Sequence, residues 1–173
     1  MRFCPFCGSV LRIDDIGGIL RLHCSSAACP YVFWDNPVPV VAAIVELEGN
    51  VILIQNKGWP THIFGLVSGF LEKGETAEDA MLREIREELN LKGEQTQFIG
   101  LYSFFAMNQL IIAYHVEASG HIEMGEELAD FRIIPPHLLR PWDFGTGPAI
   151  RDWLASRTTN HENNKEKRSN DRT

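Results

Sequence analysis

Apolar residues gather along the middle of the chain in stretches whose length and composition predict strands. Four such stretches are rich in Val, Ile, Phe and Tyr, as strands usually are: residues 40–47, 51–56, 97–106 and 109–118. Glu48-Gly49-Asn50 separates the first two and is typical of a hairpin turn. We therefore expect a β-hairpin here, followed by two further strands.

Residues 77–89 show a helical period instead. Their apolar side chains form a stripe along one helix face, made of Ala80, Met81, Leu82, Ile85 and Leu89. Thr76 followed by Asp79 resembles a capping box, in which a side-chain oxygen accepts from a backbone N–H at the helix start. Asn90 can take the left-handed conformation that commonly ends a helix. The pattern predicts a helix from Ala77 to Leu89.

Composition divides the chain into three parts. Residues 1–36 contain all four cysteines and two short strand-like pieces. Residues 37–156 mix strands with helices, and the pattern of residues 147–157 predicts a closing helix. Residues 157–173 contain no apolar side chain, so burial cannot offset the entropy of ordering them. We expect a small cysteine-bearing domain, a larger domain that mixes α and β structure, and a disordered polar tail.

The charge of the chain excludes some classes of partner. Its formal net charge is −7, whereas general nucleic-acid binders and membrane-surface binders present basic patches. A nucleotide substrate held through metal ions remains compatible with this charge. The first residues, MRFCPFCGSV, contain no apolar core of a signal peptide, and no run approaches the roughly 18 apolar residues of a membrane span. We expect a cytoplasmic protein without a membrane segment.

The cysteines occur as two pairs, Cys4 with Cys7 and Cys24 with Cys29. Two pairs joined by a hairpin can surround one Zn²⁺ tetrahedrally, and four thiolates leave no position open for water. Disulfides are the alternative, and they are disfavoured in a chain without a secretory signal. The spacing predicts a zinc ribbon with a structural ion.

Acidic residues crowd the predicted helix. A helix rotates by about 100° per residue, so Glu84, Glu87 and Glu88 project from one face. Their like charges repel one another there. Glu75 precedes the helix, and Arg83 can fix a carboxylate with its rigid fork. By charge alone, a solvated face and a cation site are both compatible with this pattern.

The order of these residues resembles a known signature. Gly69-x5-Glu75-x7-Arg83-Glu84-Ile85-x-Glu87-Glu88-x-x-Leu91 is similar to the signature of the Nudix hydrolase family. Asn90 stands where the family has Gly. The resemblance implies an α/β (α+β) fold, an α/β/α sandwich with a mixed sheet, here preceded by the zinc ribbon. It also implies a hydrolase that cleaves nucleoside diphosphates linked to another moiety, with Mg²⁺ or Mn²⁺ as cofactor.

The resemblance also implies roles for single residues. Glu84 and Glu88 become metal ligands, Glu87 lies beside them, and Glu75 supports the loop or reaches a metal through water. The segment EMGEELAD lies where relatives place a further metal-binding glutamate, and we select Glu126 from its Glu126-Glu127 pair. The alternative is that both are solvent-exposed loop charges.

Catalysis is assigned to Glu84, Glu87 and Arg83 on the same basis. Arg83 orients a glutamate, and Gly69 lets the backbone turn tightly. The general base is a glutamate of the signature or one from a later loop, and the resemblance leaves both open.

A zinc ribbon before a Nudix domain is similar to the NADH pyrophosphatase branch and to plant-type enzymes that act on FAD and ADP-ribose. In the NADH branch two aromatic residues clamp a base, and here those positions are Trp34 and Phe70. Domain-interface packing is the alternative for both. That branch carries SQPWPFP where this chain has SFFAMNQL. The expected substrate is therefore a dinucleotide pyrophosphate, namely NADH, ADP-ribose or FAD.

Two expectations remain beyond the site. Relatives with this architecture are often homodimers, so a homodimer is expected here. A non-catalytic nucleotide sensor on the same fold is the alternative function, although such proteins usually lose the glutamates that this chain retains.

Overall fold

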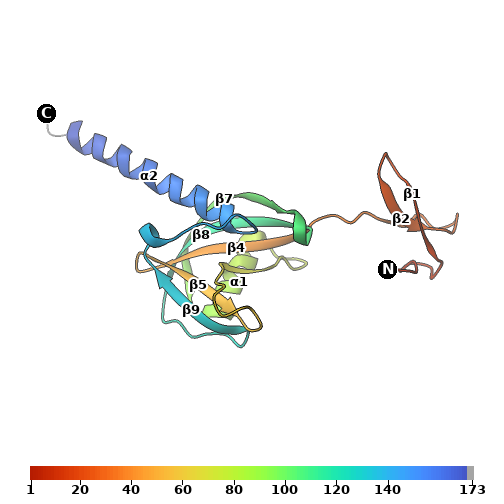
Figure 1. The fold of residues 1–173 in the computed structure, drawn as a ribbon, viewed down its shortest axis with the longest axis horizontal. Helices are drawn as coiled ribbons and strands as arrows, with labels where there is room; N and C mark the ends of the chain where they lie inside the picture. The colour runs from red at the N-terminus through yellow and green to blue at the C-terminus, as the bar shows by residue number, and fades with distance from the viewer. Residues whose placement is uncertain (171–173) are drawn as a thin grey trace. The chain divides into compact units, whose positions relative to one another are not determined.

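The computed structural model describes residues 1–170, with side chains up to Thr158. The chain divides into two compact units, Met1–Pro37 and Val38–Thr173. The first contains a short hairpin and the second holds the larger sheet and both α-helices (Figure 1).

The first unit is built on a small antiparallel sheet of three strands, β1 (Leu11–Asp15), β2 (Leu20–Cys24) and β3 (Val32–Phe33). Gly17 and Gly18 close the β1–β2 turn with φ of 68° and 84°, a conformation that other residues adopt only with strain. The buried core of this unit is small and consists of Cys4, Leu11 and Cys24. A core of this size gives little stability without a further crosslink.

The second unit contains a six-stranded sheet in the order β7-β8-β4-β5-β9, with β6 also paired to β4. Strand β4 runs parallel to β8 and antiparallel to β5 and β6, so the sheet is mixed, as expected. The bounds are β4 (Val38–Leu47), β5 (Asn50–Asn56), β6 (Val67–Phe70), β7 (Lys92–Phe104), β8 (Gln109–Ser119) and β9 (Leu128–Ile134). Two short 3₁₀ turns, η1 (Phe105–Met107) and η2 (Pro136–Leu138), follow β7 and β9.

The predicted strands are present, and their connections follow from local residue types. Glu48 and Gly49 both take positive φ, 50° and 78°, which matches the twist of a tight β-hairpin. The hairpin between β4 and β5 is therefore confirmed. The stretch 97–106 was expected to be extended throughout, but its last two residues, Phe105 and Ala106, belong to η1.

Helix α1 (Ala77–Leu89) begins and ends where the sequence predicts. The Thr76 hydroxyl accepts from the backbone N–H of Asp79 at 3.1 Å and donates to its carboxylate at 2.7 Å. At the other end Asn90 takes φ 55°, and its N–H donates to the carbonyl of Arg86 at 2.9 Å. Asn90 therefore ends the helix in the conformation that glycine usually supplies.

Two separate clusters of buried side chains cover the two faces of the sheet. One packs α1 against the sheet and includes Val41, Ala43 and Val45 of β4, while Ile44 belongs to the cluster that contains Trp153 of α2. Successive strand residues point to opposite faces, so β4 contributes to both cores. The expected α/β/α arrangement is confirmed, with α1 and α2 on opposite faces (Figure 1).

Helix α2 (Gly147–Asn170) extends beyond the closing helix that the sequence predicts. Residues 157–170, expected to be disordered, are helical, and residues 171–173 of that expected tail lie outside the described part. Extending a helix adds a hydrogen bond for each residue fixed and needs no burial, and Glu, Lys and Arg favour helices. No helix in the described range is both long and apolar enough to cross a membrane.

Candidate active site

A cavity of about 570 Å³ lies in the second unit, where α1 meets the sheet. Its walls come from the end of β5, from β6 and the loop after it, from α1, and from the loop before β9. The lining residues are Asn56, Ser68, Gly69, Phe70, Glu72, Arg83, Glu84, Glu87, Glu88, Gly125, Glu126 and Glu127. Helical spacing on α1 thus brings Glu84, Glu87 and Glu88 together on one wall, as the sequence predicts.

Gly69 makes room for one of these carboxylates. A Cβ atom at this position would lie 2.0 Å from the Cδ atom of Glu84. Gly69 itself is a strand residue of β6, paired with Val41, and does not take a left-handed conformation. The expected tight turn is therefore absent, and the close approach of the Glu84 side chain explains the glycine.

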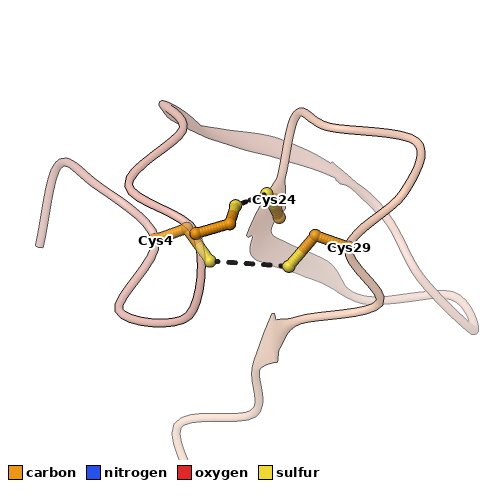
Figure 2. Close-up of side chains that lie close together, drawn as sticks. Cys4, Cys24 and Cys29 are labelled. Atoms are coloured by element: carbon orange, nitrogen blue, oxygen red, sulfur yellow. Dashed lines mark hydrogen bonds between the residues drawn. The ribbon is translucent and has the colours of Figure 1, made fainter.

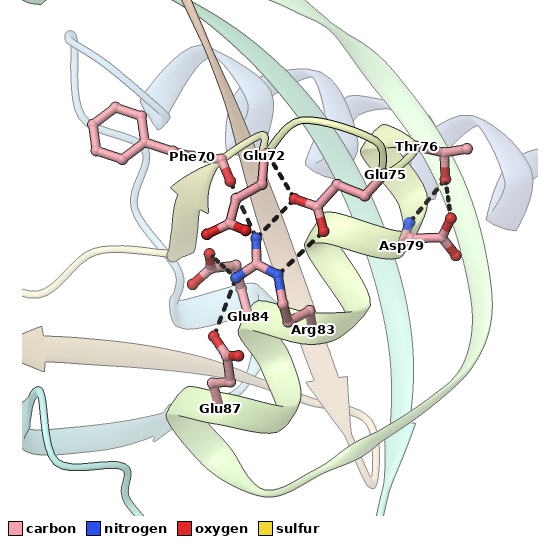
Figure 3. A network of polar contacts seen from close by, with 8 residues as sticks. All are labelled: Phe70, Glu72, Glu75, Thr76, Asp79, Arg83, Glu84 and Glu87. Atoms are coloured by element: carbon pink, nitrogen blue, oxygen red, sulfur yellow. Dashed lines mark hydrogen bonds and ion pairs between the residues drawn. The ribbon is translucent and has the colours of Figure 1, made fainter.

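Arg83 braces the acidic residues around it (Figure 3). Its Nη1 donates to Glu84 at 2.6 Å and to Glu87 at 3.1 Å, while Nε and Nη2 contact both oxygens of Glu75 at 3.2 and 2.9 Å. Nη2 also donates to the carbonyl of Phe70 at 3.2 Å. One guanidinium therefore fixes three carboxylates and ties α1 to the end of β6.

Glu75 is fully engaged by its neighbours. Besides the two contacts with Arg83, its Oε1 accepts from the backbone N–H of Glu72 at 2.7 Å. Hydrogen bonds from Arg83 lower the pKa of Glu75 below its ordinary value, and the bond from Glu72 adds to this effect. These contacts favour the loop-supporting role of the two that were expected for Glu75.

Glu88 has the opposite environment. It is 6% exposed, and its Oε2 is buried without a hydrogen-bond partner among the described residues. Burial, together with the charges of Glu84, Glu127 and Glu87, raises the pKa of Glu88 to about 8. A buried carboxylate without a donor is costly, and a cation at this position would relieve that cost.

The loop before β9 is fastened to the end of α1. Glu123 N–H donates to the Leu89 carbonyl at 3.0 Å, and Gly125 N–H donates to the Glu88 carbonyl at 2.8 Å. A Cβ on Gly125 would lie 2.3 Å from the carbonyl oxygen of Glu87, so only glycine permits this approach. These bonds place the glutamates that follow beside the cavity.

Both glutamates of that loop, Glu126 and Glu127, line the cavity. Glu126 is the ligand expected from the sequence, yet the charge of Glu127 is the one that raises the pKa of Glu88. The backbone carbonyl of Glu127 also accepts from Lys57 N–H at 2.8 Å. Adjacent glutamates in one loop are equivalent by pattern, so the sequence offered no means of choosing between them.

A family model described as NUDIX domain matches residues 36–154, which is more than half of the chain. The chain belongs to the Nudix family. The resemblance of its sequence to the Nudix signature is thereby confirmed. The acidic cavity lies within the matched Nudix domain.

Two relatives illustrate the similarity. NAD-capped RNA hydrolase NudC of Pseudomonas fluorescens is 24% identical over 142 residues, covering 81% of this chain and 50% of that protein. NAD-capped RNA hydrolase NUDT12 of Homo sapiens is 31% identical over 119 residues, covering 64% of this chain and 25% of that protein. The chain thus spans about half the length of the bacterial relative and a smaller share of the human one.

Solved structures agree on the Nudix fold. A crystal structure of a NUDIX hydrolase from Nitrosomonas europaea matches with a TM-score of 0.75 at 23% identity, covering 92% of this chain and 93% of that one. A MutT NUDIX hydrolase from Burkholderia pseudomallei matches with a TM-score of 0.56 at 24% identity, covering 68% of this chain and 98% of that one.

The two aromatic residues expected to clamp a base belong to different units. Phe70 borders the cavity of the Nudix domain and is 59% exposed, with its ring directed away from Arg83 (Figure 3). Trp34 lies in the first unit and is 52% exposed. Arg21 stacks 4.9 Å from the centre of the Trp34 ring and donates to the Trp34 carbonyl at 2.6 Å. Both rings are accessible to a ligand.

The four cysteines of the first unit converge, and Figure 2 labels Cys4, Cys24 and Cys29 among them. The sulfur atoms of Cys4, Cys7, Cys24 and Cys29 all lie within 4.8 Å of one another. Hydrogen bonding with Ser9 lowers the pKa of Cys7 to about 6. The Ser26 N–H acts to lower the pKa of Cys24, but burial and the neighbouring thiols raise it to about 12. The cluster fits a zinc ribbon, because a dication would stabilise thiolates that otherwise oppose one another.

Proposed function

We propose that this protein is a metal-dependent Nudix pyrophosphohydrolase that cleaves the diphosphate of a nucleoside diphosphate derivative. The proposal rests above all on Glu88, a buried carboxylate whose Oε2 has no partner among the described residues. It lies in one cavity with Glu84, Glu87, Glu126 and Glu127. An ordinary solvated face has no reason to bury a carboxylate in this way.

The donor set fits Mg²⁺ or Mn²⁺, since hard divalent cations prefer carboxylate and carbonyl oxygens. Glu84 and Glu88 would hold the cation from α1, with Glu87 close beside them and Glu126 as a further ligand from the loop before β9. When bound, such an ion neutralises diphosphate charge and lowers the pKa of a coordinated water. The fit rests on the unpartnered Oε2 of Glu88, which needs a positive or donating neighbour.

The chain's own residues supply positioning and proton transfer. Arg83 fixes Glu84 and Glu87 in place through its Nη1, and Glu75 in turn fixes Arg83. We assign removal of a proton from the attacking water to Glu87, whose side chain is 59% exposed at the cavity and reaches Arg83 through Oε2 alone. Glu84, at 14%, is less accessible to such a water. Positioned carboxylates of this kind accelerate proton transfer by about 10²–10⁴-fold.

The substrate class that we propose is a dinucleotide pyrophosphate such as NADH, ADP-ribose or FAD. The exposed ring of Phe70 at the cavity offers a base an aromatic face to stack on, which contributes about 1–3 kcal/mol per base. The relatives named above act, by name, on NAD-capped RNA, which carries a dinucleotide on a nucleic acid. The expected exclusion of nucleic acid thus lacks support, and a capped RNA belongs among the substrates to test.

A panel assay tests this proposal. The substrates are NADH, NAD, ADP-ribose, FAD, diadenosine polyphosphates and a short NAD-capped RNA, each in Mg²⁺ and in Mn²⁺, with product masses to locate the cleaved bond. We expect release of a nucleoside monophosphate, and a loss of about 100-fold or more in kcat for Glu87→Gln and Glu88→Gln. Full metal-dependent turnover by both variants would contradict the assignment.

A non-catalytic nucleotide sensor is the second candidate. It would bind the same substrates without turnover, so calorimetric binding with no product in the panel would favour it. The complete set Glu84, Glu87 and Glu88 together with the Arg83 brace favours the enzyme.

We propose a structural Zn²⁺ in the first unit. Four sulfur ligands leave no position for water, so such an ion would support the fold of the ribbon and take no part in hydrolysis.

A further inference from the structure

A second residue with an unpartnered oxygen lines the same cavity as Glu88. Asn56 is the last residue of β5, and its Oδ1 is buried with no hydrogen-bond partner among the described residues. Asn56 also lines the acidic cavity. A buried carbonyl oxygen without a donor lowers stability, so a residue that keeps one requires an explanation.

The neighbouring amide shows that this strand end can satisfy its polar groups. Gln55 Nε2 donates to the carbonyls of Pro60 and Ile63 at 2.9 and 3.2 Å. The β5–β9 register shifts between Gln55 and Asn56, so that Asn56 pairs with Leu128. Such bulges are common beside active sites, where they redirect a side chain. Here the bulge occurs at Asn56, whose side chain belongs to the cavity lining, whereas the side-chain amide of the adjacent Gln55 is hydrogen-bonded.

The two residues with unpartnered oxygens line the cavity from different structural elements. Oε2 of Glu88 comes from α1, and Oδ1 of Asn56 comes from β5. Arg83 is the one positively charged residue among those that line the cavity. Its guanidinium already donates to Glu75, Glu84 and Glu87. Neither oxygen has a donor among the described residues, and one bound cation would satisfy both.

We propose that Asn56 is a further ligand of the divalent cation, which its Oδ1 holds from the β5 side while Glu88 holds it from α1. This inference rests on the proposed function. Asparagine carbonyls are regular ligands of hard cations, and a neutral oxygen adds a contact without adding to the negative charge already present.

The test measures cation binding directly in the full chain, without substrate. Free Mn²⁺ is followed by electron paramagnetic resonance during a titration of wild type and of four variants. Asn56→Leu removes the oxygen at similar volume and should weaken Mn²⁺ binding about tenfold, as loss of a metal contact commonly does. Asn56→Asp restores an oxygen and should bind at least as tightly as wild type.

The third variant, Glu88→Gln, removes a charge from the same cation and should weaken Mn²⁺ binding at least as much as Asn56→Leu. The fourth is the matched control Asn50→Leu, which makes the same change at the other end of β5, where the amide donates to the Glu48 carbonyl. Its Mn²⁺ binding should equal that of wild type.

Thermal unfolding without added divalent cation supplies a second measurement. Asn56→Leu should melt no lower than wild type, because it removes an unsatisfied acceptor, and it should gain less from added Mn²⁺ than wild type does. A purely structural asparagine would show the reverse, with a lower melting temperature and unchanged Mn²⁺ binding, which would overturn the inference.

The remaining outcomes separate the two claims. Wild-type Mn²⁺ binding in Asn56→Leu, together with weakened binding in Glu88→Gln, would overturn the role of Asn56 and leave the proposed function standing. A wild-type chain that binds no Mn²⁺ would overturn both. Unchanged Mn²⁺ binding with a raised KM would also reject the inference, because Asn56 would then contact substrate.

Discussion

At the scale of single residues, the carboxylates of the cavity divide into two electrostatic groups. Arg83 donates hydrogen bonds to Glu84 and Glu87, and also to Glu75 beside the cavity, whose pKa it lowers. Glu88 lies one turn further along α1 from Glu84, and burial disfavours its charged form. The cavity therefore presents fixed negative charge beside one carboxylate that gains most from a bound cation.

Glu88 makes the stability of the cation-free protein depend on pH. Its pKa rises from the ordinary 4.5 to about 8 on folding. Below pH 4.5 the carboxyl is protonated in both states and its contribution is fully present. As pH rises toward 8 the unfolded chain releases the proton while the folded protein keeps it, so stability falls. Glu88→Gln should therefore melt higher than wild type at pH 8, with the difference shrinking toward pH 5.

This prediction is checked by thermal denaturation at pH 5 and pH 8 without added divalent cation. Glu123→Gln, an exposed change in the nearby loop, is the control and should follow wild type at both values. Equal melting of wild type and Glu88→Gln at pH 8 would show that the Glu88 carboxyl is not destabilised by burial.

Gly69→Ala tests the close approach of Glu84 to β6. The new methyl group would occupy the place of the Glu84 carboxylate, 2.0 Å from its Cδ. A flexible side-chain end can move aside, so we expect stability within about 1 kcal/mol of wild type. Displacing Glu84, which we propose as a cation ligand, should nevertheless lower kcat by about tenfold or more.

Gly93→Ala in β7 provides the contrast. Its Cβ would lie 2.3 Å from Leu82 Cδ2, at the edge of the core under α1 and away from the cavity lining. It should lower the melting temperature and leave Mn²⁺ binding intact. If Gly69→Ala instead destabilised the fold and spared activity, the spatial account of this glycine would be wrong.

Some of the site follows from the sequence because it depends on one helix. The shared face of Glu84, Glu87 and Glu88 follows from helical period alone. The true reason for Gly69 and the unpartnered Asn56 depend on β6 pairing with β4 and on the bulge between β5 and β9. These are long-range pairings, and no local pattern encodes them.

At the scale of elements, α1 is the part of the fold that residue types specify most completely. Thr76 caps its start, Asn90 ends it with φ 55°, and the side chains of Ile85 and Leu89 are buried without exposure. Propensity, capping and burial all favour the same bounds, which explains why the sequence predicts Ala77–Leu89 correctly.

Asn90 can be tested as the substitute for the family's glycine. Asn90→Gly should retain activity and change the free energy of unfolding by less than about 1 kcal/mol, because glycine adopts the same left-handed conformation freely. Asn90→Ala should cost about 1–2 kcal/mol, because a Cβ without a compensating polar group is strained there. Urea denaturation measures both. Equal stability of the two variants would indicate that the helix end does not require this conformation.

Other elements depend on their tertiary surroundings, so local sequence patterns do not predict their bounds. β6 is a four-residue strand, VSGF, defined by its pairing with β4, and the apolar residues of β9, LADFRII, follow no strict alternation. The polar continuation of α2 to Asn170 lies where the sequence analysis expects a disordered tail. Absence of apolar residues predicts absence of burial, and a helix can continue without it.

At the scale of the whole molecule, the two units have separate cores and unequal means of stability. Val38–Thr173 buries side chains on both faces of its sheet, whereas the core of Met1–Pro37 consists of Cys4, Leu11 and Cys24. A small apolar core rarely holds a fold alone, so the cysteine cluster should carry most of the stability of the first unit.

Removal of zinc should therefore unfold the first unit and spare the second. After treatment with a zinc chelator, limited proteolysis should cut within Met1–Pro37 and leave a resistant fragment that begins near Val38. The thermal transition of that fragment should match the main transition of the untreated protein.

Elemental analysis should give about one zinc per chain before treatment. Cys24→Ser should reproduce the cleavage without chelator, while Ser25→Ala, the same size of change next to the ligand, should not. Loss of the whole fold in one transition on zinc removal would show that the second unit depends on the first, contrary to their separate cores.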